Sequence, residues 1–127
     1  MRYTLMLHYP EMTAAELGDE ALAEGMRAFD DYARELEAAG VLQSAEVLQP
    51  STATTTVTLA SGELVVQDGP FADSREQLGG IIVIDVADLD AALSWASKAP
   101  SASYGHVEIR PGATRFVDGV WTNYDHH

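Results

Sequence analysis

Two histidines are the first residues of this chain whose types could do chemistry. His8 closes a segment of alternating apolar and polar residues, and His106 lies near the start of another. An imidazole changes charge near neutral pH, so it can act as a general base, hold a polar ligand group or bind a metal. We therefore predict His8 and His106 as candidate catalytic residues. Ordinary interface or surface histidines are the alternative.

A charged loop offers a second set of candidates. The stretch DGPFADSREQLGG, residues 68–80, places Asp68, Arg75 and Glu76 in one connection. An arginine beside a carboxylate can clamp an anionic or hydroxylated ligand through paired hydrogen bonds. Asp68 is a further catalytic candidate, and the three charges could equally serve only to hold the loop in shape. The predicted ligand-binding residues are Asp68, Arg75, Glu76, Tyr104 and His106.

The same loop carries strong backbone signals. Gly69 precedes a proline, which favours extended geometry, and the Asp68 carboxylate can accept nearby backbone N–H groups. Phe71 is expected to anchor the loop in the core. Gly79 and Gly80 lack the GxGxxG and GxxxxGK phosphate-binding patterns and precede a strand, so they indicate close backbone packing.

The sequence predicts no metal site and no cofactor. A metal normally takes three or four protein ligands, and the histidines show neither HxH nor HExxH spacing. The chain contains no cysteine, which excludes disulfides, thiolate zinc sites and thiol nucleophiles. The last three residues, Asp125, His126 and His127, are expected to form a solvated end rather than a metal site.

Composition limits the partners. The chain has 127 residues, the size of one domain, and 20 acidic against 7 basic residues give a net charge of −13. Such a charge repels nucleic acid and anionic lipid, so neither is an expected partner. The apolar run at the N-terminus is broken by His8 and Pro10 and is too short for a signal peptide or a membrane span. We expect a soluble cytoplasmic protein.

The hydrophobic periods predict strands and helices in a definite order. An apolar stripe at helical spacing predicts a helix over residues 13–39, with Thr13 and Glu16 as a capping box and a plausible break at Gly18. Asp88 is expected to cap a second helix that ends before Pro100. Strands are predicted at residues 2–9, 41–49, 81–86 and 104–110, and a hairpin at 54–59 and 63–67.

This order predicts an α+β fold with a ferredoxin-like antiparallel sheet, two helices on one face and an inserted β-hairpin. The first and last strands of such a sheet are neighbours, so His8 and His106 should lie together on the face without helices. Arg2 should lie near Glu108 and Arg110 and form a cross-strand ion pair. Because residues 81–86 are apolar on both faces, we predict that a second copy covers the open face, making a homodimer.

Five stretches of the chain resemble the DGPF-domain branch of the YciI-related (YCII) family. They are DGPFADSREQLGG, MRYTLMLHY, ELEAAGVLQSAEVLQP, IIVIDVADLDAALSWA and YGHVEIRPG. The resemblance covers residues 1–112 and leaves residues 113–127 as a C-terminal extension. It implies a ferredoxin-like fold that dimerises through its sheets, as in dimeric α+β barrels.

The resemblance transfers a function less readily. Members of the wider family are proposed to use a histidine in the first helix with a nearby aspartate, and a few relatives act on hydroxylated aromatic compounds. Counting back from Gly40, the histidine position holds Phe29 and the aspartate position falls near Ala38. Neither side chain can transfer a proton, so no catalytic residue is carried over.

Two functions follow from these observations. The favoured one is a small-molecule-binding or accessory, regulatory protein, because Phe29 replaces the family histidine. The alternative is a cofactor-free enzyme that uses general acid–base chemistry on a small hydroxylated or aromatic compound, with His8 or His106 as the base.

Overall fold

The computed structural model describes residues 1–124 as a mixed α+β fold with an antiparallel sheet and three helices. Four strands form the main sheet, and every neighbouring pair is antiparallel. Their order across the sheet is β2 (Leu42–Val47), β5 (Glu76–Asp85), β1 (Arg2–Pro10) and β6 (His106–Pro111). The strand predicted at residues 81–86 begins earlier because residues 76–80 pair with the end of β1.

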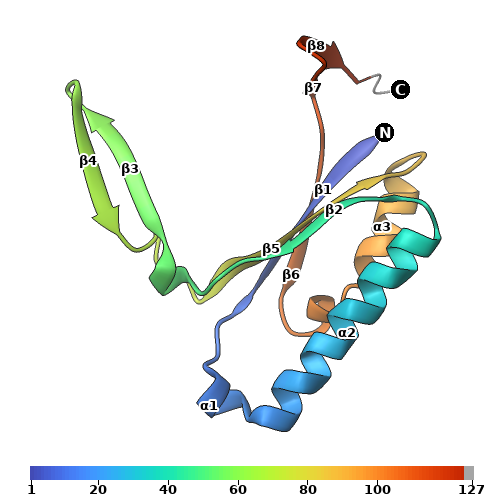
Figure 1. The fold of residues 1–127 in the computed structure, drawn as a ribbon, viewed down its shortest axis with the longest axis horizontal. Coiled ribbons are helices and arrows are strands. Elements are labelled where there is room, and N and C mark those ends of the chain that lie inside the picture. The colour runs from blue at the N-terminus through green and yellow to red at the C-terminus, as the bar shows by residue number, and fades with distance from the viewer. Residues whose placement is uncertain (125–127) are drawn as a thin grey trace.

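The helices cover one face of this sheet, as the ribbon shows (Figure 1). They are α1 (Ala14–Leu17), α2 (Asp19–Ala38) and α3 (Leu89–Ser97). The predicted long helix is divided at Gly18, whose φ of 89° suits glycine. The Thr13 hydroxyl accepts the Glu16 N–H at 3.1 Å and completes the predicted capping box, and Asp88 caps α3 through the Ala91 N–H at 2.9 Å.

The core lies between the helices and the central strands. On β1, Tyr3, Leu5 and Leu7 are buried, whereas the residues between them are only half-buried. This period of two is that of a strand with one covered face. Ile82 and Ile84 of β5 join the same layer; on the helices the buried residues are Tyr32, Leu36, Ala92 and Ala96.

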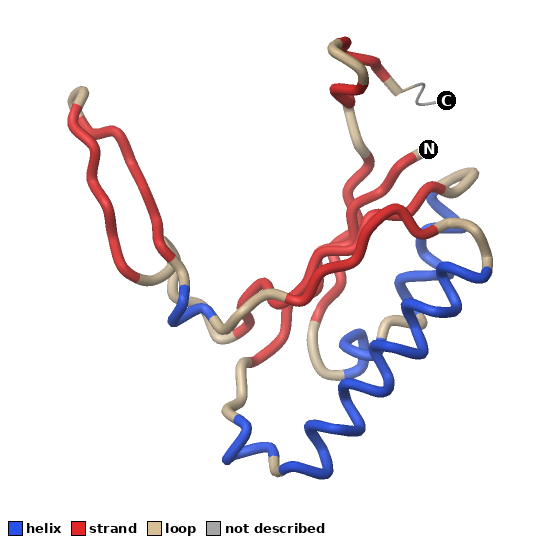
Figure 2. The backbone as a smooth tube through the Cα atoms, viewed as in Figure 1, coloured by secondary structure: helices blue, strands red, loops and turns tan. Residues whose placement is uncertain are grey.

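Two hairpins leave the sheet on the side away from the helices (Figures 1 and 2). Strands β3 (Thr55–Ala60) and β4 (Glu63–Asp68) form the longer hairpin, and β7 (Thr114–Val117) and β8 (Val120–Asn123) form the shorter one. Short 3₁₀ turns, Ser51–Ala53 and Pro100–Ser103, lead into β3 and β6. Residues 125–127, predicted to form a solvated end, lie outside the described residues.

One expectation about the core is wrong. Phe71 is 86% exposed and does not anchor its loop in the core. Trp121 of the shorter hairpin is also exposed and packs against Phe116, with ring centroids 5.2 Å apart. Among the helices of residues 1–124, none combines the length and apolar character that a bilayer crossing requires.

The buried Tyr32 hydroxyl gives a test of the helix–helix contact. It donates to the Trp95 carbonyl at 2.7 Å, and burial raises the pKa of Tyr32 to about 12. We expect Tyr32→Phe to lower the free energy of unfolding by about 1 kcal/mol, the net worth of one hydrogen bond. Urea denaturation measures the change. Tyr104→Phe, at an exposed ring, is the control and should change the free energy of unfolding little. If Tyr32→Phe were as stable as Tyr104→Phe and the wild type, the Tyr32–Trp95 hydrogen bond would not stabilise the fold.

Candidate functional site

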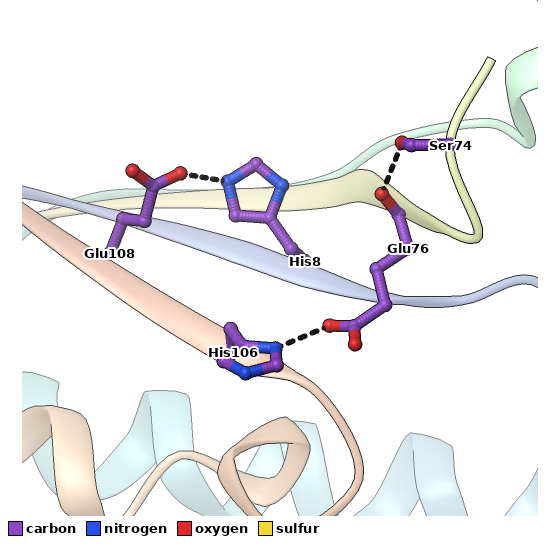
Figure 3. Close-up of polar contacts among 5 residues, drawn as sticks. All are labelled: His8, Ser74, Glu76, His106 and Glu108. Atoms are coloured by element: carbon purple, nitrogen blue, oxygen red, sulfur yellow. Dashed lines mark hydrogen bonds and ion pairs between the residues drawn. The ribbon is translucent and has the colours of Figure 1, made fainter.

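The two predicted histidines lie side by side at one end of the sheet. His8 and His106 are direct cross-strand partners of β1 and β6. Each contacts a carboxylate: His8 Nε2 lies 2.5 Å from Glu108 Oε1, and His106 Nδ1 lies 2.6 Å from Glu76 Oε1 (Figure 3). Four strand residues from β1, β5 and β6 therefore form two histidine–carboxylate pairs, which we name the paired-histidine site.

The local sequence fixes this geometry through two glycines. Leu7 pairs with Gly80 but His8 pairs with Leu78, so Gly79 is the extra residue of a bulge. A Cβ at Gly79 would overlap the Tyr9 ring, and one at Gly105 would overlap the His8 carbonyl. The predicted close packing is thus found at Gly79, whereas a Cβ at Gly80 would lie 3.1 Å from Leu7 and 3.3 Å from the Glu46 carbonyl.

The two pairs differ in geometry and exposure. His106 is 77% exposed and hydrogen-bonds Glu76, whose bond and negative charge raise the pKa of the imidazole. The Ser74 hydroxyl donates to the Glu76 carbonyl at 2.7 Å and holds this end of β5. His8 is half-buried, with 26% of its side chain exposed, and its Nε2 approaches Glu108 without the alignment of a hydrogen bond. His106 is therefore the more accessible of the two bases.

Two tyrosines pack beneath this end of the sheet. Tyr9 and Tyr104 meet edge to face, with ring centroids 5.9 Å apart and planes at 70°. Burial first, and then the charges of Tyr104 and Glu11, raise the pKa of Tyr9, and burial raises that of Tyr104. Both phenols therefore stay protonated at neutral pH and can donate hydrogen bonds.

The predicted loop residues do not all gather at the site. Glu76 reaches His106, but Asp68 is exposed at the end of β4 and Arg75 is exposed before β5. Within residues 1–124, no ion pair joins Asp68 or Arg75 to Glu76. Hydrogen bonds to the backbone hold the loop instead: the Gly69 N–H donates to the Thr54 carbonyl at 2.7 Å, and the Thr56 hydroxyl donates to the Gly69 carbonyl at 2.8 Å. Gly69 has a φ of 97° rather than the expected extended geometry.

Glu108 is the partner that sequence reasoning missed. Arg2 was expected beside Glu108, but its Nη1 donates to Gln43 Oε1 at 3.4 Å, and Glu108 turns to His8. The signal was present, because Glu108 follows His106 by two residues and so shares its face. The observed register pairs Glu108 with Met6, which lies two residues from His8 but four from Arg2.

Clefts lie elsewhere on the surface. One of about 220 Å³ is lined by Phe29, Tyr32 and Leu7, so the position where the resemblance expects a histidine is an apolar contact. Two others, of about 610 and 370 Å³, lie around the end of β2 and the turn that follows it. Asp68, Arg75, Glu76, Tyr104 and His106 line none of these three clefts. Within residues 1–124, no three His, Asp or Glu side chains converge as metal ligands would.

Two comparisons relate the chain to known proteins. A model of the YCII-related domain matches residues 1–112. The chain is also similar to an uncharacterized protein, R00369, of Rhizobium meliloti (strain 1021). The two are 36% identical over 113 residues, which cover 87% of this chain and 91% of that protein.

The His106–Glu76 contact predicts a pH effect. The pKa of His106 should lie above the value of about 6.5 for a free imidazole, and Glu76→Gln should lower it toward that value. Glu108→Gln is the matched control and should leave the pKa of His106 unchanged. Imidazole signals followed by NMR from pH 4 to 9 measure both.

The sign of the linked stability follows from the raised pKa. The contact stabilises the folded state fully below the unfolded pKa and loses this contribution as the pH rises through the folded pKa. A His106 pKa that is the same in wild type and Glu76→Gln would show that the contact does not persist in solution.

Proposed function

The chain belongs to the YCII-related family, and from this premise we propose that it binds a small polar or hydroxylated aromatic molecule at the paired-histidine site. One observation carries the proposal: two imidazoles in cross-strand register, each within 2.6 Å of a carboxylate. Such an arrangement offers donors and acceptors at fixed spacing, which a hydroxylated ring can satisfy. We assign the chain to the DGPF branch, with a ferredoxin-like fold and a cytoplasmic location.

A second copy of the chain supplies the missing wall of this site. The helix-free face exposes part of Met6, Ile81 and Val83, and the hairpins that rise beside it carry further apolar side chains. The exposed ones are Val57, Leu59, Leu64, Val65, Val66, Phe116, Val120 and Trp121. Exposed apolar side chains in this number indicate an interaction site. The proposed assembly is a homodimer of the dimeric α+β barrel type, with no nucleic-acid or membrane partner.

The distribution of charge also favours the helix-free face as the surface where two copies meet. The chain carries −13 overall, and nine of its acids lie between Glu11 and Glu37, on the segment that forms α1 and α2. By the register of the sheet, the helix-free side carries Arg2, Arg110 and two histidines beside Glu46, Glu76, Asp85 and Glu108. Two copies that meet there bring together charges of both signs, whereas two helical faces rich in acids would repel.

The homodimer is tested by placing a carboxylate at its centre. Ile81→Glu should raise the dimer dissociation constant at least about tenfold, because the charge would be buried without a partner. Leu93→Glu is the control, since Leu93 is 49% exposed on α3. Sedimentation equilibrium gives the association state, and circular dichroism checks folding. A wild-type monomer at high concentration, or a dimer that Ile81→Glu leaves intact, would contradict the proposal.

Ligand binding is tested with catechol and phenol as probes. NMR titration should shift the imidazole signals of His8 and His106, and His106→Gln should weaken catechol binding about tenfold through loss of a hydrogen bond with a charged group. Arg27→Gln, at an exposed position of α2 away from this face, should leave binding unchanged. If neither imidazole responds to either probe, hydroxylated aromatic molecules are not the ligands of this site.

General acid–base catalysis is the second candidate function. The observation that favours it is the exposed His106 imidazole that hydrogen-bonds Glu76, because the carboxylate raises the pKa of the imidazole and makes it a stronger base. An ester probe separates the two functions. Hydrolysis of the ester 4-nitrophenyl acetate by water that is lost in His106→Gln indicates an enzyme, whereas saturable catechol binding without such hydrolysis indicates a binding protein.

A further inference from the structure

The cleft of about 610 Å³ lies across the sheet from the paired-histidine site. Tyr9 follows His8 directly, and successive strand side chains point to opposite faces, so Tyr9 lies on the helix side. The cleft opens between the end of β1, the start of α2 and the segment after β2. Its volume falls within the range of about 300–1,000 Å³ typical of small-molecule sites. A peptide helix or strand would need a longer groove.

The walls of this cleft are mainly apolar. Met12 and Leu22 approach from the connection and the helix, and the remaining apolar members come from the strands and their ends. The lining includes Tyr9, Met12, Leu22, Val47, Leu48 and Leu78. Such a lining removes apolar ligand surface from water, which favours binding by about 25 cal/mol per Å².

One charged group lines the cleft, and it is an acid. Glu11 Oε2 accepts the Ser51 N–H at 2.7 Å, which orients the carboxylate at the rim. Its other oxygen, Oε1, forms no hydrogen bond within residues 1–124. No lysine or arginine of that part of the chain lines the cleft. The charge also reaches the neighbouring phenol, because Glu11 contributes to the raised pKa of Tyr9.

The acidic residues at the start of α2 also disfavour an anionic ligand in this cleft. The N-terminal end of α2 carries a partial positive charge that could attract one. Asp19 and Glu20 already occupy the first turn of α2, however, and Glu16 lies just before it. Their carboxylates compensate the helix end and add negative potential beside the cleft.

We propose that this cleft binds an organic ammonium ion: a small molecule with an apolar, preferably aromatic, body and one protonated amine that meets the Glu11 carboxylate. The apolar body fills the space against Leu22 and Met12, and the Tyr9 ring provides an aromatic surface for a cation. The site is separate from the paired-histidine site, so either proposal can fail without the other.

Three probes with one aromatic body and different charges test the proposal. They are 2-naphthylmethylammonium, 2-naphthalenemethanol and 2-naphthoate, titrated into the full chain at neutral pH. The ammonium ion should bind about threefold more tightly than the alcohol, as an accessible ion pair allows, and the naphthoate most weakly. NMR should show shifts at the Met12 methyl group and Leu22, with the His8 and His106 imidazole signals unmoved.

Two matched pairs of variants locate the site. Glu11→Gln keeps an oxygen for Ser51 and should abolish the preference for the ammonium ion, whereas Glu20→Gln, outside the lining, should retain it. Leu22→Gln should weaken all three probes about tenfold through loss of apolar contact. Leu17→Gln should not, although Leu17 and Leu22 are equally exposed at 38%. Thermal melts confirm that each variant is folded.

Several results would overturn the proposal. They are no binding of any probe to the wild type, equal affinity for the ammonium ion and the naphthoate, and an ammonium preference that survives Glu11→Gln. Shifts confined to the hairpins or to the paired-histidine site would place the probes elsewhere and also overturn it. Glu11→Gln and Glu20→Gln leave the apolar walls intact, so the comparison of these two variants decides the question even if Leu22→Gln unfolds the chain.

Discussion

The alternation of side chains along β1 is the constraint on which the rest of the structure depends. Tyr3, Leu5 and Leu7 must lie under the helices, since they supply the apolar layer of the core. The residues that alternate with them, Thr4, Met6 and His8, are then forced to the other face. A slip of one residue would exchange the two sets and bury polar side chains, so the core itself holds the histidine in place.

This constraint carries over to β6 through antiparallel pairing. Val107 and Ile109 pack against the core, which leaves His106 and Glu108 on the face of His8. The energy that places the paired-histidine site therefore comes from apolar burial on the opposite side of the sheet. The site's own contacts, between partly exposed groups, contribute little to folding. Polar residues placed in this way can change without disturbing the fold.

Local patterns predicted the parts of the fold that obey short periods. The alternation of β1 and β6, the cap at Thr13 and the break at Gly18 all depend on residues a few positions apart, and the structure has them. The neighbouring positions of His8 and His106 followed from strand order. The strand alternation, the cap and the break depend on sequence spacing alone, whereas the histidine pair also required the ferredoxin-like strand order inferred from the order of the elements.

The predictions were wrong where a side chain had several possible partners that are distant in the sequence. Arg2 contacts Gln43 and Glu108 contacts His8, because the register of β1 and β6 places Met6, four residues from Arg2, opposite Glu108. Phe71 was expected inside because it is aromatic, but it is exposed in the turn that leaves the long hairpin. Hydrophobicity predicts burial only when some surface is available to cover the residue, and the helix-free side of a single copy offers little.

Tyr9 and His8 couple the cleft to the paired-histidine site, although different ligands are proposed for the two. They are consecutive residues, and the same two glycines make room for both: Gly79 lies against the Tyr9 ring, and Gly105 lies against the His8 carbonyl and Tyr9. A carbonyl cannot move aside as a flexible side chain can, so a Cβ at position 105 would push β1 from β6 and part His8 from His106. The requirement for glycine at position 105 thus arises from backbone contact, and it preserves the paired-histidine site and the wall of the cleft together. The bulge at Gly79 and the loop at Gly105 therefore position two consecutive side chains that point to opposite faces of the sheet.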